Sequence, residues 1–182
     1  PLLVTNLVVV NASGKQCLAA FDRDTGEHVW TVGSDSASYS SPFMAHVAGR
    51  DQIISFNDAS ISAHDPSIGD MLWSHPWNAK QPKVALPVVL PNDRLHFSSG
   101  YGVGSQLFQV KPNPSGDLEI ESLWKTIKMK AKFTNLIHKD GFIYGLDDGI
   151  MACQDVATGE LKWKDGRYGH GQILFDGETI LV

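Results

Sequence analysis

A short motif that returns along the chain constrains the fold more than any other feature of the sequence. Each full copy has a small residue, an aspartate, a glycine and a tryptophan at positions 1, 3, 7 and 11 of the motif. A chain built from such copies folds as a series of similar units, because each unit buries its apolar face against its neighbours. The full copies run over 20–30, 63–73 and 153–163.

The tryptophans of the motif give the length of the repeating unit. Trp30, Trp73, Trp124 and Trp163 are 43, 51 and 39 residues apart. Trp124 ends a fourth, altered copy, in which Pro112 stands at the aspartate position and the gap from glycine to tryptophan grows from four residues to eight. The mean spacing of about 44 residues is the size of one four-stranded blade of a β-propeller.

Each position of the motif has a physical reason. An aspartate whose carboxylate accepts backbone N–H groups two or three residues on, followed by a glycine with positive φ, makes a tight turn between two strands. A tryptophan at a fixed distance after this turn can lie between adjacent sheets, where it buries roughly 150–250 Å². We therefore expect the motif to join the two outer strands of a blade and to dock one blade on the next. The residues with these roles are Asp22, Gly26, Trp30, Asp65, Gly69, Trp73, Trp124, Asp155, Gly159 and Trp163.

Short apolar runs between the motifs predict the two inner strands of each blade. The sequence thus predicts an all-β fold, a β-propeller of four-stranded antiparallel blades with about four and a half blades present out of seven or eight. All 182 residues are expected to belong to this one domain. The expected blades are 1–32, 42–75, 85–126 and 133–164, with a half blade at 171–182. The expected inner strands are 2–4 and 7–10, 43–47 and 52–56, 85–90 and 94–97, 133–137 and 142–145, and 172–175 and 179–182.

Charge and hydropathy exclude several classes of partner. The formal net charge is -5, so a broad positive surface for nucleic acid is not expected. The lysines between Lys125 and Lys132 are interpreted as a solvated loop. No apolar run approaches the roughly 20 residues that a membrane span requires. Because the chain begins at Pro1 instead of methionine, an upstream part with a signal peptide is compatible with it.

Four patterns contain residue types found in known sites but lack the spacing or the partners that those sites need. Cys17 and Cys153 lack a C-x-x-C partner, and both are expected to be buried. The acidic run 22–26 fails as a calcium loop, because its glycine comes too early and Gly33 stands where a glutamate is needed. The glycine-rich run 100–105 lacks the spacing and the helix of a phosphate loop. It is read as a flexible loop, with close backbone approach to a ligand as the alternative, and the seven histidines show no zinc spacing.

The connections between strands offer the best candidates for binding. In a propeller, the loops that join the second strand to the third and one blade to the next surround the mouth of the central channel. These loops are expected to bind a protein or a small polar ligand. No nucleophile with its base can be recognised among them, so no catalytic residue and no metal ligand is assigned. The candidate binding residues are Tyr39, Asn57, Trp77, Lys83, Tyr101, Lys132, Asp147 and His170, with Asp58 and Asp148 beside them.

The motif resembles the repeat of pyrroloquinoline-quinone-type (PQQ-like) propellers, whose pattern Ala-x-Asp-x-x-Thr-Gly-x-x-x-Trp is met at 20–30 and nearly met at 153–163. The stretches 39–42, 98–104 and 153–155 are similar to bacterial proteins of this repeat family, which are mostly extracytoplasmic. The same repeat serves quinone-dependent alcohol and sugar dehydrogenases and non-catalytic scaffolds, including an outer-membrane assembly lipoprotein. The dehydrogenases bring an adjacent cysteine pair and a set of calcium ligands, which this sequence lacks.

The resemblance and the missing ligands lead to one hypothesis with two alternatives. The leading hypothesis is a non-catalytic or ligand-binding scaffold in the periplasm or otherwise outside the cytoplasm, with no evident cofactor. The first alternative is a PQQ-dependent dehydrogenase whose cofactor ligands lie in blades outside this sequence. The second alternative is a peptide-docking scaffold that depends on Tyr101 and Trp77.

Overall fold

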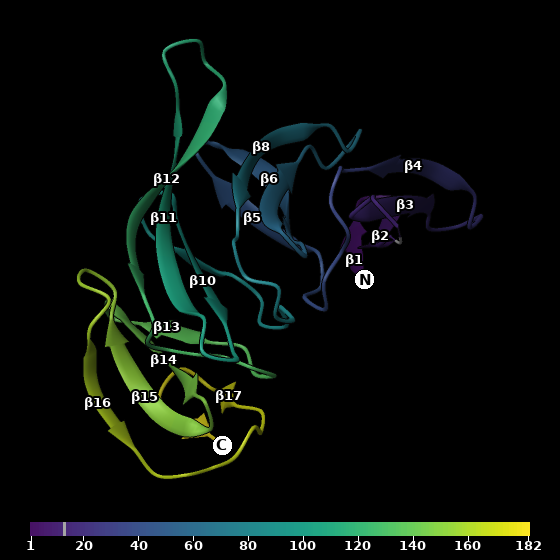
Figure 1. Cartoon of the computed structure of the whole chain (residues 1–182). Coiled ribbons are helices and arrows are strands. Elements are labelled where there is room, and N and C mark those ends of the chain that lie inside the picture. The colour runs from purple at the N-terminus through teal and green to yellow at the C-terminus, as the bar shows by residue number, and fades with distance from the viewer. Residues whose placement is uncertain (13) are drawn as a thin grey trace. The chain divides into compact units, whose positions relative to one another are not determined.

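The computed structural model describes residues 1–12 and 14–182, and its regular structure consists of strands, with no helix in those residues (Figure 1). The strands form four antiparallel sheets of four strands, each in chain order, and one sheet of two strands. This confirms the expected all-β fold of four-stranded blades. The first blade contains β1 (Leu2–Val4), β2 (Leu7–Asn11), β3 (Leu18–Asp22) and β4 (His28–Val32).

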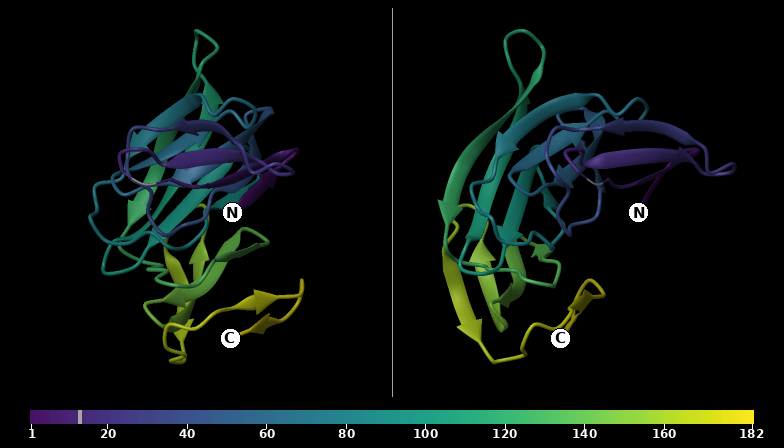
Figure 2. Two further views of the ribbon diagram at one scale, coloured as in Figure 1. Left: turned by 90° about the vertical axis from the view of Figure 1, so that its right-hand side faces the viewer. Right: turned by 45° about the vertical axis from the view of Figure 1, so that its right-hand side comes forward.

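The other blades repeat this order, and Figure 2 shows the strands in two further views. The second contains β5 (Phe43–Val47), β6 (Arg50–Phe56), β7 (Ser60–His64) and β8 (Met71–Pro76). The third contains β9 (Val88–Leu90), β10 (Arg94–Ser99), β11 (Gly104–Pro112) and β12 (Leu118–Thr126). The fourth contains β13 (Ile137–Lys139), β14 (Phe142–Asp147), β15 (Ile150–Asp155) and β16 (Leu161–Asp165). The two-stranded sheet is β17 (Leu174–Phe175) with β18 (Ile180–Leu181).

Several first strands are shorter than the sequence predicted, and one is displaced. The strand expected at 85–90 covers only β9, because Pro87 has no N–H to give to a sheet. The strand expected at 133–137 begins only at Ile137, so most of that apolar run belongs to the connection before β13. The strands expected at 172–175 and 179–182 shrink to two residues each.

The turn of the motif has the expected chemistry. The Asp22 carboxylate accepts the backbone N–H groups of Asp24 and Thr25 at 3.0 and 2.8 Å, and Gly26 has φ +74°. In the same way Asp65 accepts the N–H of Ser67 at 2.8 Å. In the fourth blade, Asp155 accepts the N–H of Ala157 at 2.8 Å.

The altered copy forms its turn one residue later than expected. The repeat pattern placed the turn residue at Pro112. In the structure, the side-chain oxygen of Asn113 accepts the backbone N–H groups of Ser115 and Asp117 at 2.9 and 3.1 Å. Proline has no side-chain oxygen for this purpose, whereas asparagine makes the same turn as aspartate. The two strands that meet here are nine residues long each, so the extra residues of this copy lengthen the hairpin.

The chain divides into two compact units, 1–80 with 110–120 and 81–109 with 121–182. In the first unit, Val9, Leu18 and Ile53 are among the fully buried core residues. In the second unit, Met129 and Ile143 are fully buried in an equivalent core. A buried side chain of this size contributes about 2 kcal/mol, so each unit has a core of its own.

Two of the motif glycines, Gly69 and Gly159, lie against tryptophans of the preceding blade. A Cβ atom on Gly69 would stand 2.9 Å from the ring of Trp30, within the first unit. A Cβ atom on Gly159 would stand 2.9 Å from the ring of Trp124, within the second unit. Only a glycine lets the ring approach the backbone this closely. By contrast, Trp163 is 46% exposed.

Candidate functional site

Loops of the second unit bring four of the predicted binding residues together. Tyr101 lies in the turn between β10 and β11, and Lys132 lies in the connection from β12 to β13. Asp147 is the last residue of β14, and His170 lies in the connection from β16 to β17. These connections are the ones that the propeller topology places around a channel mouth. Their convergence around Lys132 defines the candidate site.

Lys132 is fixed by three groups. Its ammonium Nζ lies 3.2 Å from Oδ1 of Asp148 and 3.3 Å from Nε2 of His170. It also lies 4.9 Å from the centre of the Tyr101 ring, within the range of a cation–π contact. The aliphatic stem packs against Gly100, where a Cβ atom would collide with it. The charge of Lys132 is therefore held in one place instead of swinging freely in solvent.

Exposed rings lie beside this lysine, at Tyr101 and Phe133, and at Tyr168 in the connection that carries His170. Tyr101 is 41% exposed, and Phe133 is 44% exposed with its ring edge-on to His170 at 6.0 Å between centroids. Tyr168 is 53% exposed, and its N–H donates to the carbonyl of Gly149 at 2.9 Å. Rigid aromatic side chains are enriched among the residues that dominate protein–protein binding. We call this set the Lys132 surface; it comprises Tyr101, Lys132, Phe133, Asp148, Tyr168 and His170.

The buried carboxylate of Asp147, the residue before Asp148, holds together the chain segments next to the Lys132 surface. Asp147 receives Nζ of Lys130 at 2.6 Å, Nζ of Lys164 at 2.7 Å and the backbone N–H of Lys130 at 2.9 Å. Burial by itself raises the pKa of Asp147, but the hydrogen bonds from the two lysines outweigh it and hold the pKa below the ordinary value. The carboxylate therefore stays ionised and ties β14 to β16 and to the connection before β13.

The other predicted binding residues lie elsewhere, and most of them are buried. Lys83 has no exposed surface. In the first unit, Trp77 packs edge-on against Phe56 at 4.9 Å. The buried Asn57 receives the hydroxyl of Ser55 at 2.6 Å. The position of a residue in a loop was readable from sequence, but the direction of its side chain was not. Of these residues only Tyr39 is highly exposed.

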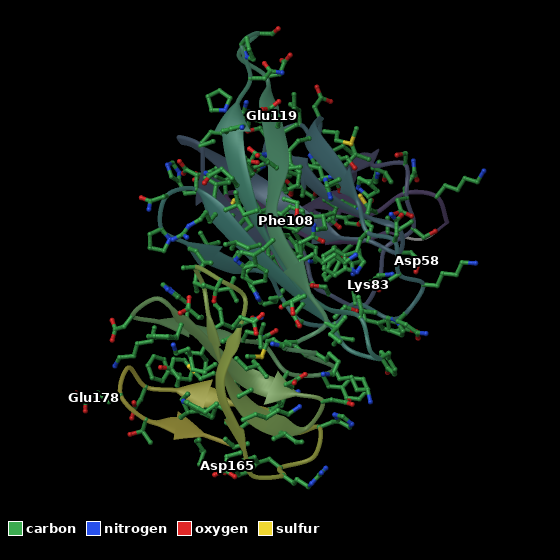
Figure 3. All side chains as sticks on the ribbon, turned by 60° about the vertical axis from the view of Figure 1, so that its left-hand side comes forward. Asp58, Lys83, Phe108, Glu119, Asp165 and Glu178 are labelled. Atoms are coloured by element: carbon green, nitrogen blue, oxygen red, sulfur yellow. The ribbon has the colours of Figure 1, made fainter. Side chains whose placement is uncertain are left out.

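The first unit has a separate open pocket of about 450 Å³. Its lining combines the acidic Asp58, marked in Figure 3, with Lys80, Asn78 and Trp77. Such a mixture of charges, an amide and a ring suits a small polar molecule. Both this pocket and the Lys132 surface are formed by residues of the connections that were expected to surround the channel mouth.

A buried cysteine–histidine contact in the first unit is not a nucleophile with its base. Sγ of Cys17 lies 3.6 Å from Nε2 of His64, and Ser62 lies 2.9 Å from the same nitrogen. Burial raises the pKa of Cys17 and lowers the pKa of His64, so both groups are held neutral. A neutral, inaccessible thiol does not attack a substrate. Both cysteines of the chain are buried and free, as the sequence predicted for burial.

Sequence reasoning missed Phe133 and Tyr168. Both are aromatic residues in connections between blades, one beside Lys132 and the other two residues before His170. Their positions beside Lys132 and near His170 in the sequence could have identified them as candidates. Within 1–12 and 14–182, no three potential metal ligands gather, and no helix is long and apolar enough to cross a membrane.

Comparison with known proteins gives the same fold. Residues 1–165 match the family described as "Outer membrane protein assembly factor BamB". The crystal structure of BamB from Moraxella catarrhalis superposes with a TM-score of 0.66 at 17% sequence identity, covering 98% of this chain and 55% of that one. A putative exported protein from Bacteroides fragilis gives a TM-score of 0.41 at 13% identity, covering 88% and 50%. No curated protein gives a significant match.

The family match spans most of the chain and agrees with the repeat, the blades and the superposition. The chain spans about half the length of the BamB structure that it matches. At 17% sequence identity, the superposition supports only the shared fold, whereas the family match shows membership of the family. This chain belongs to the PQQ-like repeat family of the outer membrane protein assembly factor BamB.

Proposed function

We propose that this protein is a non-catalytic interaction scaffold of outer-membrane protein assembly, that it acts outside the cytoplasm, and that the Lys132 surface binds a polypeptide partner. The family relationship supports the scaffold role. The observation that carries the binding site is a lysine fixed at 3.2 Å from Asp148 beside exposed rings. A fixed charge among rigid rings loses little conformational freedom on binding.

The geometry suits a segment with an apolar side chain and a nearby oxygen. The apolar side chain would cover Tyr101 and Phe133, which lose solvent-exposed surface on binding. A carbonyl or carboxylate oxygen would take a hydrogen bond from Lys132. Tyr168 would extend the contact along the segment. No covalent step is involved, and the supporting Asp147 stays out of reach of the partner.

The test measures binding of a fluorescein-labelled outer-membrane β-barrel polypeptide, diluted from urea, by fluorescence anisotropy. The double variant Tyr101→Ala with Phe133→Ala is expected to bind at least about tenfold more weakly, since each ring at such a centre is worth more than about 1 kcal/mol. The control is Tyr39→Ala, which removes a ring of the first unit that is 76% exposed and therefore more accessible than Tyr101 or Phe133. Equal affinity of the double variant and the wild type would overturn the proposed site.

The dehydrogenase alternative has a separate test. The full-length protein, supplied with pyrroloquinoline quinone and calcium, is assayed for dye reduction with alcohols and sugars. The scaffold proposal expects no turnover above the rate without protein. Reproducible dye reduction that depends on both quinone and substrate would overturn the non-catalytic role, whatever the result of the binding experiment.

A further inference from the structure

The outer strand of the third blade presents an unusually long edge. β12 is nine residues long, whereas the outer strands β4, β8 and β16 have five, six and five. It lies at the end of its sheet (Figure 1). One row of the backbone N–H and C=O groups of such an edge strand faces away from the sheet. Natural edge strands are usually kept short, because such a row is a template for pairing with another strand.

The side chains of β12 are self-complementary about Ser122. In an antiparallel pair of two identical strands centred on this serine, Glu119 of each copy stands opposite Lys125 of the other. Ile120 stands opposite Trp124, a β-branched residue against an aromatic one. Directly opposite pairs of both kinds stabilise antiparallel sheets. Both charged side chains are exposed, and Figure 3 marks Glu119 on this strand.

The charge pattern continues on the neighbouring strand. Nζ of Lys111 on β11 lies 3.7 Å from Oε1 of Glu119, with both side chains about half exposed. A second copy would add Lys125 on the other side of Glu119. The row would then alternate positive, negative and positive over three adjacent strands. Charges on an edge strand normally oppose pairing by meeting like charges, but in this register they attract.

We propose that two copies of this chain pair through antiparallel contact of their β12 strands, centred on Ser122. The interface is isologous, since the same strand is used by both copies and each contact occurs twice. The contact would also cover Leu123, which is 46% exposed. The register is specific: a shift of the centre by one residue would place Glu121 opposite Lys125, and Glu119 opposite Ile127.

Charge reversal tests the register directly. Sedimentation velocity over a range of concentrations is expected to show a dimer for the wild type. Glu119→Lys and Lys125→Glu should each weaken dimerisation about tenfold, because two attractive pairs become repulsive. An equimolar mixture of these two variants should recover the wild-type dimer, since both contacts of the mixed pair are again attractive. The double variant should dimerise like the wild type.

Glu121→Lys is the matched control, because it makes the same charge change at the position opposite Leu123. It is expected to dimerise like the wild type. Near-ultraviolet circular dichroism confirms that each variant is folded. The proposal is overturned if the wild type stays monomeric at every concentration, or if the mixture is no more dimeric than its components. It is also overturned if Glu121→Lys, and not Glu119→Lys, is the partner rescued by Lys125→Glu.

Discussion

Two blade junctions, one in each compact unit, share a backbone arrangement and differ in chemistry. In both, the motif glycine places a Cβ position 2.9 Å from the preceding tryptophan ring, at Gly69 on Trp30 and at Gly159 on Trp124. In both, the residue before the motif aspartate reaches the glycine carbonyl at 2.9 Å, from Nδ1 of His64 in one and from Nε2 of Gln154 in the other.

The polar groups around these shared contacts are satisfied differently. Trp124 donates its indole N–H to the carbonyl of Val156 at 2.9 Å. The indole N–H of Trp30 is buried and meets no acceptor among the described residues. In the second junction, Nε2 of His96 donates to the Gln154 side chain at 3.1 Å, whereas in the first the preceding blade meets His64 through the thiol of Cys17, whose Sγ lies 3.6 Å from Nε2. The repeat therefore determines where the backbones of two blades meet. The neighbouring residues determine whether the buried polar groups of the junction find hydrogen-bond partners.

The largest expected effect tests the shared part of the comparison. Gly69→Ala and Gly159→Ala should each lower the free energy of unfolding by about 3–4 kcal/mol, because a Cβ atom must fit both a positive φ and a ring at 2.9 Å. Gly26→Ala is the control, because Gly26 has a similar φ of +74° but a Cβ atom there would meet nothing within 4 Å. It should lose only about 1 kcal/mol for the backbone. Urea denaturation measures all three, and equal losses would mean that ring contact does not matter.

The buried histidines should give the two junctions different effects on how the free energy of unfolding depends on pH. Burial lowers the pKa of His96 from 6.5 to about 4, and outweighs the opposing effect of its hydrogen bond to Gln154. Between these values the unfolded chain binds a proton that the folded chain does not, so the free energy of unfolding falls as pH decreases. The full window is worth about 3 kcal/mol. His96→Gln should flatten this slope more than His64→Gln does; equal slopes in both variants would contradict the assignment.

The same repeat position carries Asn57 in the second blade and Asp147 in the fourth. Asp147→Asn should cost about 2 kcal/mol, because Lys130 and Lys164 lose their carboxylate partner. The lowered pKa of Asp147 means that its contribution is present above the ordinary carboxyl pKa and is lost as pH falls through the lowered one. The variant should therefore lack part of the acid-range loss of stability seen in the wild type. Thermal unfolding at pH 7 and below pH 4 checks both expectations.

The smallest effect tests the difference at the tryptophans. Trp124→Phe removes packing surface and the hydrogen bond to Val156, whereas Trp30→Phe removes packing surface alone. The first variant should be less stable than the second by about 1 kcal/mol. Both losses are measured against the wild type in the same denaturation series. A larger loss of unfolding free energy for Trp30→Phe than for Trp124→Phe would contradict this prediction.

Much of the candidate site was within reach of the sequence, and part was not. The topology argument named Tyr101, Lys132 and His170, and the structure brings Tyr101 and His170 within contact distance of Lys132. The same argument named Trp77 and Lys83, whose side chains turn inward. Connection loops of a propeller alternate between residues that support the loop and residues that face solvent, without a fixed period that could be read in advance.

The sequence by itself determined the blade, because the motif combines local turn chemistry with a tryptophan at a fixed distance from a glycine, and both act over a few residues. Only the tertiary structure decided which loops gather around Lys132, where Asp147 finds its two lysines, and how far the third hairpin extends. The first two features depend on side chains that are distant in the sequence and meet in space, and the third depends on the length over which β11 and β12 extend. Asn113 shows the boundary between the two: its turn chemistry was local, but an atypical register concealed it from the repeat pattern.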